Sequence, residues 1–139
     1  MKILLTFVLF FTFVSINCLS IYEIQQTDNP GFDGTYPSPC QNQIVTVTGV
    51  ITAVNFNNGF FMEDPNGREW SGIFVACSSG NNHIGDLIEV KGKVREFHGL
   101  TQIANVTLLR LIQNNFAQPQ PLKITSGDLT VNEAYESVL

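Results

Sequence analysis

The sequence predicts an all-β domain, a small antiparallel barrel of five strands. Three observations lead to this prediction. Apolar and polar residues alternate with period two over stretches rich in β-branched residues, turn sequences such as Asn-Gly, Pro-Asn-Gly and His-Gly separate those stretches, and no segment before residue 128 has helical periodicity. Short strands at this spacing are typical of small barrels and sandwiches. A generic antiparallel β-sandwich is the alternative.

Two glycines favour the barrel. Gly49 and Gly92 lie in the middle of the two longest predicted strands, residues 43–54 and 87–97. Glycine inside a strand is unfavourable unless the strand bends sharply or packs closely against another segment. Long strands must coil in a small closed barrel so that they can pair at both ends. We therefore expect a five-stranded Greek-key barrel, the OB-fold.

The remaining strands are predicted at residues 60–63, 72–77 and 100–112, with His98-Gly99 as a turn. In the first strand we expect one face to carry Val45, Val47, Ile51 and Ala53. In the second, Phe61 faces outward if its two neighbours face inward. In the fourth strand we expect one face to carry the apolar residues Ile88, Val90 and Val94. The other face would carry the charged residues Glu89, Lys91, Lys93 and Arg95.

Four segments divide the chain. Residues 1–20 have a charged start, an apolar run and small residues at the end, which predicts a secretory signal peptide. The apolar run is shorter than the roughly 20 residues of a membrane-spanning helix. We expect a secreted protein without stable membrane association, with residues 21–42 a lead-in strand and loop, residues 43–115 the barrel, and residues 116–139 an extension that would begin a following domain.

Charge and cysteines narrow the function classes. The formal net charge is −5, and loss of Lys2 with the signal peptide would leave six basic against twelve acidic residues, or −6. An acidic chain is a poor independent binder of nucleic acid. Two cysteines would remain, Cys40 and Cys77, and an even number in a secreted chain predicts a disulfide, with two free thiols as the alternative. Asn105 begins a weak glycosylation sequon.

The stretch IGDLIEVKGKVREFHGLTQI, residues 84–103, resembles the OB-fold domain of bacterial extracellular nucleases of the YhcR type. Within this stretch, the resemblance lies in Gly-Asp-Leu, Val-Lys-Gly-Lys-Val, Glu-Phe and Gly-Leu-Thr-Gln-Ile. Upstream, three further runs match the first three strands of that family in order: TVTGVITAV, GFFMEDPNG and SGIFV. It implies an accessory module beside an attached nuclease domain, which is a separate, metal-dependent part of such proteins. It does not account for the two cysteines.

Catalytic chemistry is not expected from this chain alone. A metal-dependent nuclease needs clustered carboxylates and a base. The segment 63–69 and Asp86 supply carboxylates. We interpret the segment as a β-turn and Asp86 as part of another turn. We interpret His98 as a loop residue and not as a base. We predict no catalytic residues, no metal and no cofactor.

A binding role is the leading prediction. OB-folds bind single strands on the face of the second and third strands and on the loops beside it, where bases stack on aromatic rings and basic groups follow phosphates. The candidate ligand is single-stranded DNA or RNA, held weakly. The alternative is a spacer or a protein- or glycan-interaction module, with the same rings in the core and the same charges as solubilising residues. The candidate residues are Phe56, Phe61, Trp70, Lys91, Lys93, Arg95, Phe97 and His98.

Overall fold

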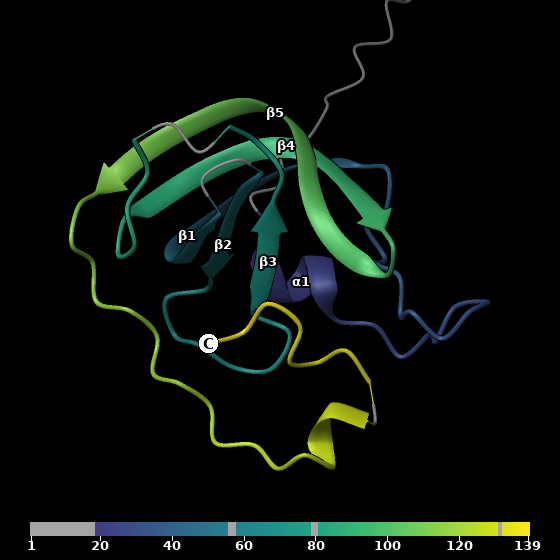
Figure 1. The fold of residues 1–139 in the computed structure, drawn as a ribbon. Coiled ribbons are helices and arrows are strands. Elements are labelled where there is room, and N and C mark those ends of the chain that lie inside the picture. The colour runs from purple at the N-terminus through teal and green to yellow at the C-terminus, as the bar shows by residue number, and fades with distance from the viewer. Residues whose placement is uncertain (1–18, 56–57, 79–80, 131) are drawn as a thin grey trace, which may run out of the picture.

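The five predicted strands close into a barrel in the computed structural model, which describes residues 19–55, 58–78, 81–130 and 132–139 (Figure 1). The predicted signal peptide lies outside the described residues except for its last two positions. Neighbouring strands follow the order β1–β2–β3–β5–β4, and β3 pairs with β5 in parallel while the other pairs are antiparallel. This architecture confirms the predicted OB-fold-like barrel. The strands are β1 (Ile44–Asn55), β2 (Gly59–Glu63), β3 (Gly72–Val75), β4 (Leu87–Phe97) and β5 (Leu100–Gln113).

The core follows the predicted alternation in β2 and β4. Phe60 and Met62 are fully buried, so Phe61 between them faces outward. Burying an apolar side chain of this size stabilises a fold by about 1.5–3 kcal/mol. In β4 the apolar face is buried and the face that carries Lys91 and Lys93 is half-buried, as expected from period two.

The alternation predicted for β1 is wrong beyond Ile51. The register of β1 against β2 shifts between Ile51 and Ala53, so that Thr52 is buried and Ala53 is exposed. The backbone of Ile51 bonds outside the β1–β2 ladder here: its N–H donates to the carbonyl of Asp86, and its carbonyl accepts from Gly85. A bulge of this kind inserts a residue and turns the following side chains over.

Both central glycines lie where another segment approaches closely, as predicted. A Cβ at Gly49 would lie 3.1 Å from Ile21 Cδ1, and one at Gly92 would lie 2.6 Å from Ile103 Cγ2. Opposite Gly92 the register of β5 shifts, and Asn105 takes a positive φ of 51° with an exposed side chain. Glycosylation of Asn105 stays a prediction.

The predicted lead-in strand is wrong, because residues 21–25 form the helix α1 (Ile21–Gln25). Ser20 and Glu23 make a capping box, in which the hydroxyl accepts from the backbone of residue 23 and the carboxylate accepts from the backbone of residue 20. Ile21 and Ile24 are fully buried and close one end of the barrel. We call this the helix end. A five-residue helix is too short to show helical periodicity in the sequence.

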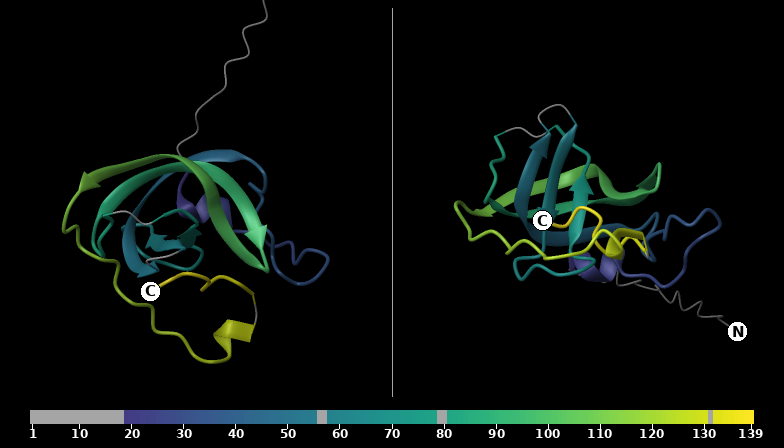
Figure 2. Two further views of the ribbon diagram at one scale, coloured as in Figure 1. Left: turned by 45° about the horizontal axis from the view of Figure 1, so that its top comes forward. Right: turned by 60° about the horizontal axis from the view of Figure 1, so that its bottom comes forward.

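The segment after β5 returns to the helix end (Figures 1 and 2). It contains the short helix η1 (Asp128–Thr130), and its last residues cross the start of β3. The N–H of Trp70 donates to the carbonyl of Ala134, and the N–H of Leu139 donates to the Glu63 carboxylate at 2.9 Å. Among the described residues, no helix is long and apolar enough to cross a membrane.

Candidate ligand-binding groove

A groove of about 610 Å³ runs over the outer face of β2, β3 and the start of β5. It lies between the β1–β2 connection and the β4–β5 turn, and its lining is more apolar than polar. Pockets of this size suit small or extended ligands that bury most of their surface. The groove is lined by Asn55, Asn58, Phe61, Phe74, Ala76, Phe97, Leu100 and Gln102.

Paired rings form the floor of the groove. Phe61 of β2 and Phe74 of β3 are direct cross-strand partners, with ring centroids 4.9 Å apart and an interplanar angle of 53°. Phe74 points outward because Ile73 and Val75 point into the core, and it is 9% exposed beneath its neighbours. Aromatic pairs of this geometry are stabilising. The pair fixes the orientation of Phe61, which is half-buried.

Phe97 forms the opposite side of the groove and is 59% exposed. It is the last residue of β4, and the turn that follows has positive φ at both His98 and Gly99, 54° and 85°. Two such residues form the tight hairpin turn that matches strand twist. The imidazole of His98 packs edge-on against the Phe97 ring at a centroid distance of 4.4 Å. This contact holds the exposed ring beside the groove.

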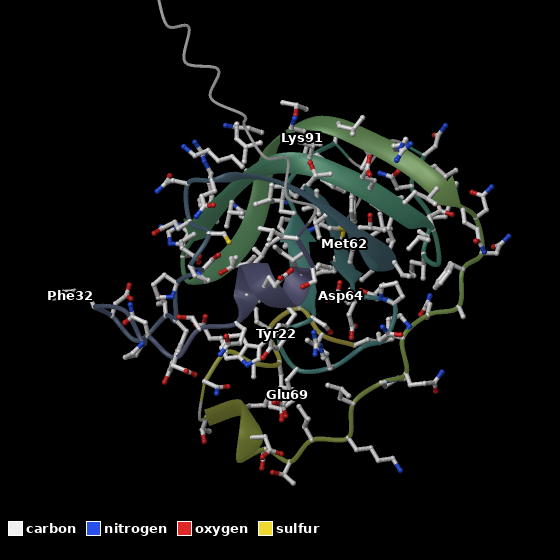
Figure 3. The ribbon with its side chains drawn as sticks, turned by 180° about the vertical axis from the view of Figure 1, so that it is seen from behind. Tyr22, Phe32, Met62, Asp64, Glu69 and Lys91 are labelled. Atoms are coloured by element: carbon white, nitrogen blue, oxygen red, sulfur yellow. The ribbon has the colours of Figure 1, made fainter. Side chains whose placement is uncertain are left out.

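Only part of the predicted basic stripe lies at this groove. Arg95 is the cross-strand partner of Gln102, which lines the groove, and Arg95 is exposed. Lys93 pairs with Ala104, one step further along β5, and Lys91 lies between β1 and the distal half of β5. Figure 3 shows Lys91 on the opposite side of the barrel from the helix end. The stripe therefore leaves the groove along β4.

Two further candidates remain, Phe56 and Trp70. Phe56 lies outside the described residues, whereas Trp70 lines a different pocket at the helix end, whose described lining residues are not those of the groove. The sequence analysis missed Phe74, although the same alternation that predicts Phe61 would have placed it outward, between two inward β-branched residues. It also missed Gln102 and Leu100, for which no local signal exists.

The predicted disulfide is wrong, because Cys40 and Cys77 are both free thiols. Cys40 lies beside α1, with its thiol 3.8 Å from the carbonyl of Glu23. The first residue of β3, Gly72, accepts a hydrogen bond from α1, so β3 starts beside this helix. Cys77 follows the last residue of β3 and therefore lies beyond the opposite end of the strand. Burial raises the pKa of both thiols. An even count of cysteines does not bring them within bonding distance.

The carboxylates considered for catalysis have structural partners. Asp64 accepts hydrogen bonds from the first two N–H groups of α1, both at 3.3 Å. Glu63 is fully buried and accepts from Ser71 and Leu139, and burial raises its pKa. Asp86 accepts from the N–H of His83. Within the described ranges, no three acidic, histidine or cysteine side chains are placed so that they could hold a metal ion.

Comparison with known proteins finds a likeness to solved structures alone. The chain matches no protein-family model and no curated protein. Among solved structures it is similar to the hypothetical protein ygiW from E. coli, with 18% identity and a TM-score of 0.41 over 52% of this chain and 77% of that chain. It is also similar to a chain of a Replication Protein A heterotrimer bound to ssDNA, with 16% identity and a TM-score of 0.45 over 69% and 80%. At these values the function has to be argued from the groove itself.

Proposed function

We propose that this chain is a secreted OB-fold module that holds single-stranded nucleic acid weakly in the groove between β2, β3 and β5. The observation that supports this most directly is that Phe61 and Phe97 line the same open groove. Unstacked bases gain about 1–3 kcal/mol from each aromatic platform, whatever their sequence. Two platforms together contribute about 2–6 kcal/mol, and this small total predicts weak binding.

The polar groups of the groove suit bases better than a purely apolar ligand. Asn55, Asn58 and Gln102 line it beside the rings, and their amides offer both donors and acceptors. Arg95 at the edge can neutralise one phosphate. In this proposal the rings supply most of the affinity, and the basic stripe of β4 adds little beyond Arg95.

The resemblance to YhcR-type extracellular nucleases extends the proposal. Residues 84–103 carry the resemblance, and in such proteins the cutting is done by a separate domain. We propose that this module acts in the same way, by keeping a strand near a nuclease domain attached to it, and that it does not cut by itself. Secretion by the predicted signal peptide is part of the same proposal.

The proposal is tested with a fluorescently labelled oligothymidine and anisotropy at low salt. Phe61→Ala and Phe97→Ala should each weaken binding by about 5- to 100-fold, the loss of one stack. Phe32→Ala is the matched control, since this fully exposed ring projects on a loop away from the barrel (Figure 3). Each variant is first shown to melt at the wild-type temperature.

The salt dependence separates the contributions of the rings and the charges. Loss of Arg95 should reduce the slope of log K against log salt by about 0.7, the contribution of one phosphate on a single strand. If Lys91→Ala and Lys93→Ala reduce this slope as much as the loss of Arg95 does, the nucleic-acid strand instead follows β4. Absence of binding at low salt would refute the nucleic-acid role and favour a spacer, and binding to a glycan array alone would favour a glycan-binding module.

A further inference from the structure

A second pocket, of about 390 Å³, lies at the helix end of the barrel. It is formed by α1, the turn before β3 and the C-terminal segment, and none of its described lining residues lines the groove. Figure 3 shows two of its residues, Tyr22 and Glu69, below the barrel and beside that segment. Its volume falls within the range of about 300–1,000 Å³ that small-molecule sites occupy.

Three aromatic side chains line this pocket: Tyr22, Trp70 and Tyr135. Trp70 has a positive φ of 62°. This conformation is an outlier for a bulky residue and costs of order 1–3 kcal/mol unless the surroundings impose it. Here the backbone is held by the hydrogen bond from Trp70 to Ala134. The strained backbone thus places a half-buried indole on the wall of the pocket, and such strain is concentrated at ligand sites.

Two cations face the same space. The Arg68 guanidinium lies over the Tyr22 ring, 4.0 Å from its centroid, and Lys123 lines the pocket from the C-terminal segment. In the part of the chain that the structure describes, neither side chain forms an ion pair. The carboxylate in the pocket, Glu69, accepts a hydrogen bond from Tyr135 at 2.8 Å. The described lining of the pocket holds two cations and one carboxylate, and two further carboxylates act on it from nearby: Asp64 interacts with Arg68, and Asp128 interacts with Tyr135.

These two features together limit the ligand. A neutral sugar would use the aromatic wall but would bring no anion to the two cations. Inorganic phosphate would use the cations but would leave the rings uncovered. A planar ring that carries a phosphate uses both, because aromatic faces stack on rings and Arg and Lys bind phosphate oxygens.

We propose that the pocket at the helix end binds one nucleoside monophosphate, with its base against Trp70 and its phosphate at Arg68 and Lys123. This site is separate from the groove and does not depend on the function proposed for it. It could receive a free nucleotide or the terminal nucleotide of a strand, which present the same chemistry.

Trp70 is the sole tryptophan of the chain, so its fluorescence reports on this pocket alone. The purified protein is titrated with dAMP, and with adenosine, inorganic phosphate and a neutral disaccharide as separate probes. We expect saturable quenching by dAMP below about 1 mM and at least about tenfold weaker quenching by adenosine. An oligonucleotide with a terminal phosphate is titrated separately, to distinguish binding of a strand end from binding of a free nucleotide. Quenching by dAMP or by this oligonucleotide supports the site.

Lys123→Ala is the most informative variant, because the lysine is exposed and its loss should leave the fold intact. It should weaken dAMP binding by about tenfold and leave adenosine binding unchanged, and Arg68→Ala should do the same. Phe61→Ala is the matched control, since it impairs the groove and should leave this quenching intact. Quenching by the disaccharide but not by dAMP, or dAMP binding that both cation variants leave unchanged, would overturn the proposal.

Discussion

Replacement of Gly92 by alanine should destabilise the barrel, because the added methyl group has no room. A Cβ at Gly92 would lie 2.6 Å from Ile103 Cγ2 and 2.8 Å from the carbonyl oxygen of Ala104. Movement of the Ile103 side chain can relieve the first contact. The second is with the backbone of β5, so β4 and β5 must separate at this point. Overpacking of this kind costs about 1–3 kcal/mol.

An opposing effect reduces this cost. Gly92 does not have a positive φ, so alanine can adopt its backbone conformation and restricts the unfolded chain, which stabilises by about 0.4–1 kcal/mol. The net loss is about 1–2 kcal/mol, because the backbone contact places the steric cost in the upper part of its range. In a domain of this size that loss lowers Tm by roughly 4–8 °C.

The assay is thermal and urea unfolding followed by circular dichroism, with Gly127→Ala as the matched control. A Cβ at Gly127 has Thr125 Oγ1 at 3.6 Å as its nearest neighbour, which is ordinary contact. This variant should be as stable as the wild type or up to about 1 kcal/mol more stable. If Gly92→Ala unfolds at the same temperature as Gly127→Ala, the close approach of β5 to Gly92 is refuted.

Three further predictions concern the C-terminal segment and the thiols. Burial and neighbouring carboxylates raise the pKa of Glu136 to about 8. The segment 132–139 should therefore be held most firmly below about pH 4.5 and less firmly as the pH rises through 8. Hydrogen exchange of this segment should show the pH dependence, and Glu136→Gln should remove that dependence. Gly72→Ala should release the same segment while the barrel stays protected, because a Cβ there meets its backbone. Cys40 and Cys77 should both be alkylated without a reductant, and Tm should not change when a reductant is added.

The barrel could be predicted because its signals are local. The period-two pattern of β2 and β4, the His98-Gly99 turn and the two strand glycines each report on a few neighbouring residues, and all agree with one architecture. The helix α1 could not be predicted in the same way, since five residues do not complete two helical turns. Its local signal is the Ser20 and Glu23 capping box, in which Ser20 is the last residue of the predicted signal peptide.

The candidate site could be predicted only in part, because a closed barrel has an outer face that points in every direction. The alternation of β2 and that of β4 place Phe61 and Lys91 equally outward, yet the two strands lie on either side of β1 and are not neighbours in the barrel. Trp70 likewise belongs to the helix end, since the C-terminal segment returns there. Such placements depend on strand order around the barrel and on a long-range contact, and neither has a local sequence signal.

If the groove binds nucleic acid as proposed, the distribution of charge would lead this acidic chain to select one form of it. Arg110 is paired with Glu89 at 3.1 Å, Arg68 and Lys123 lie at the helix end, and the stripe of β4 leaves the groove after Arg95. The groove therefore has little charge with which to hold a backbone. A duplex hides the faces of its bases and presents two rows of phosphates, so it would gain no stacking and would meet a net negative protein. An unpaired strand exposes its bases to the rings, and this difference favours single strands without any sequence-specific contact.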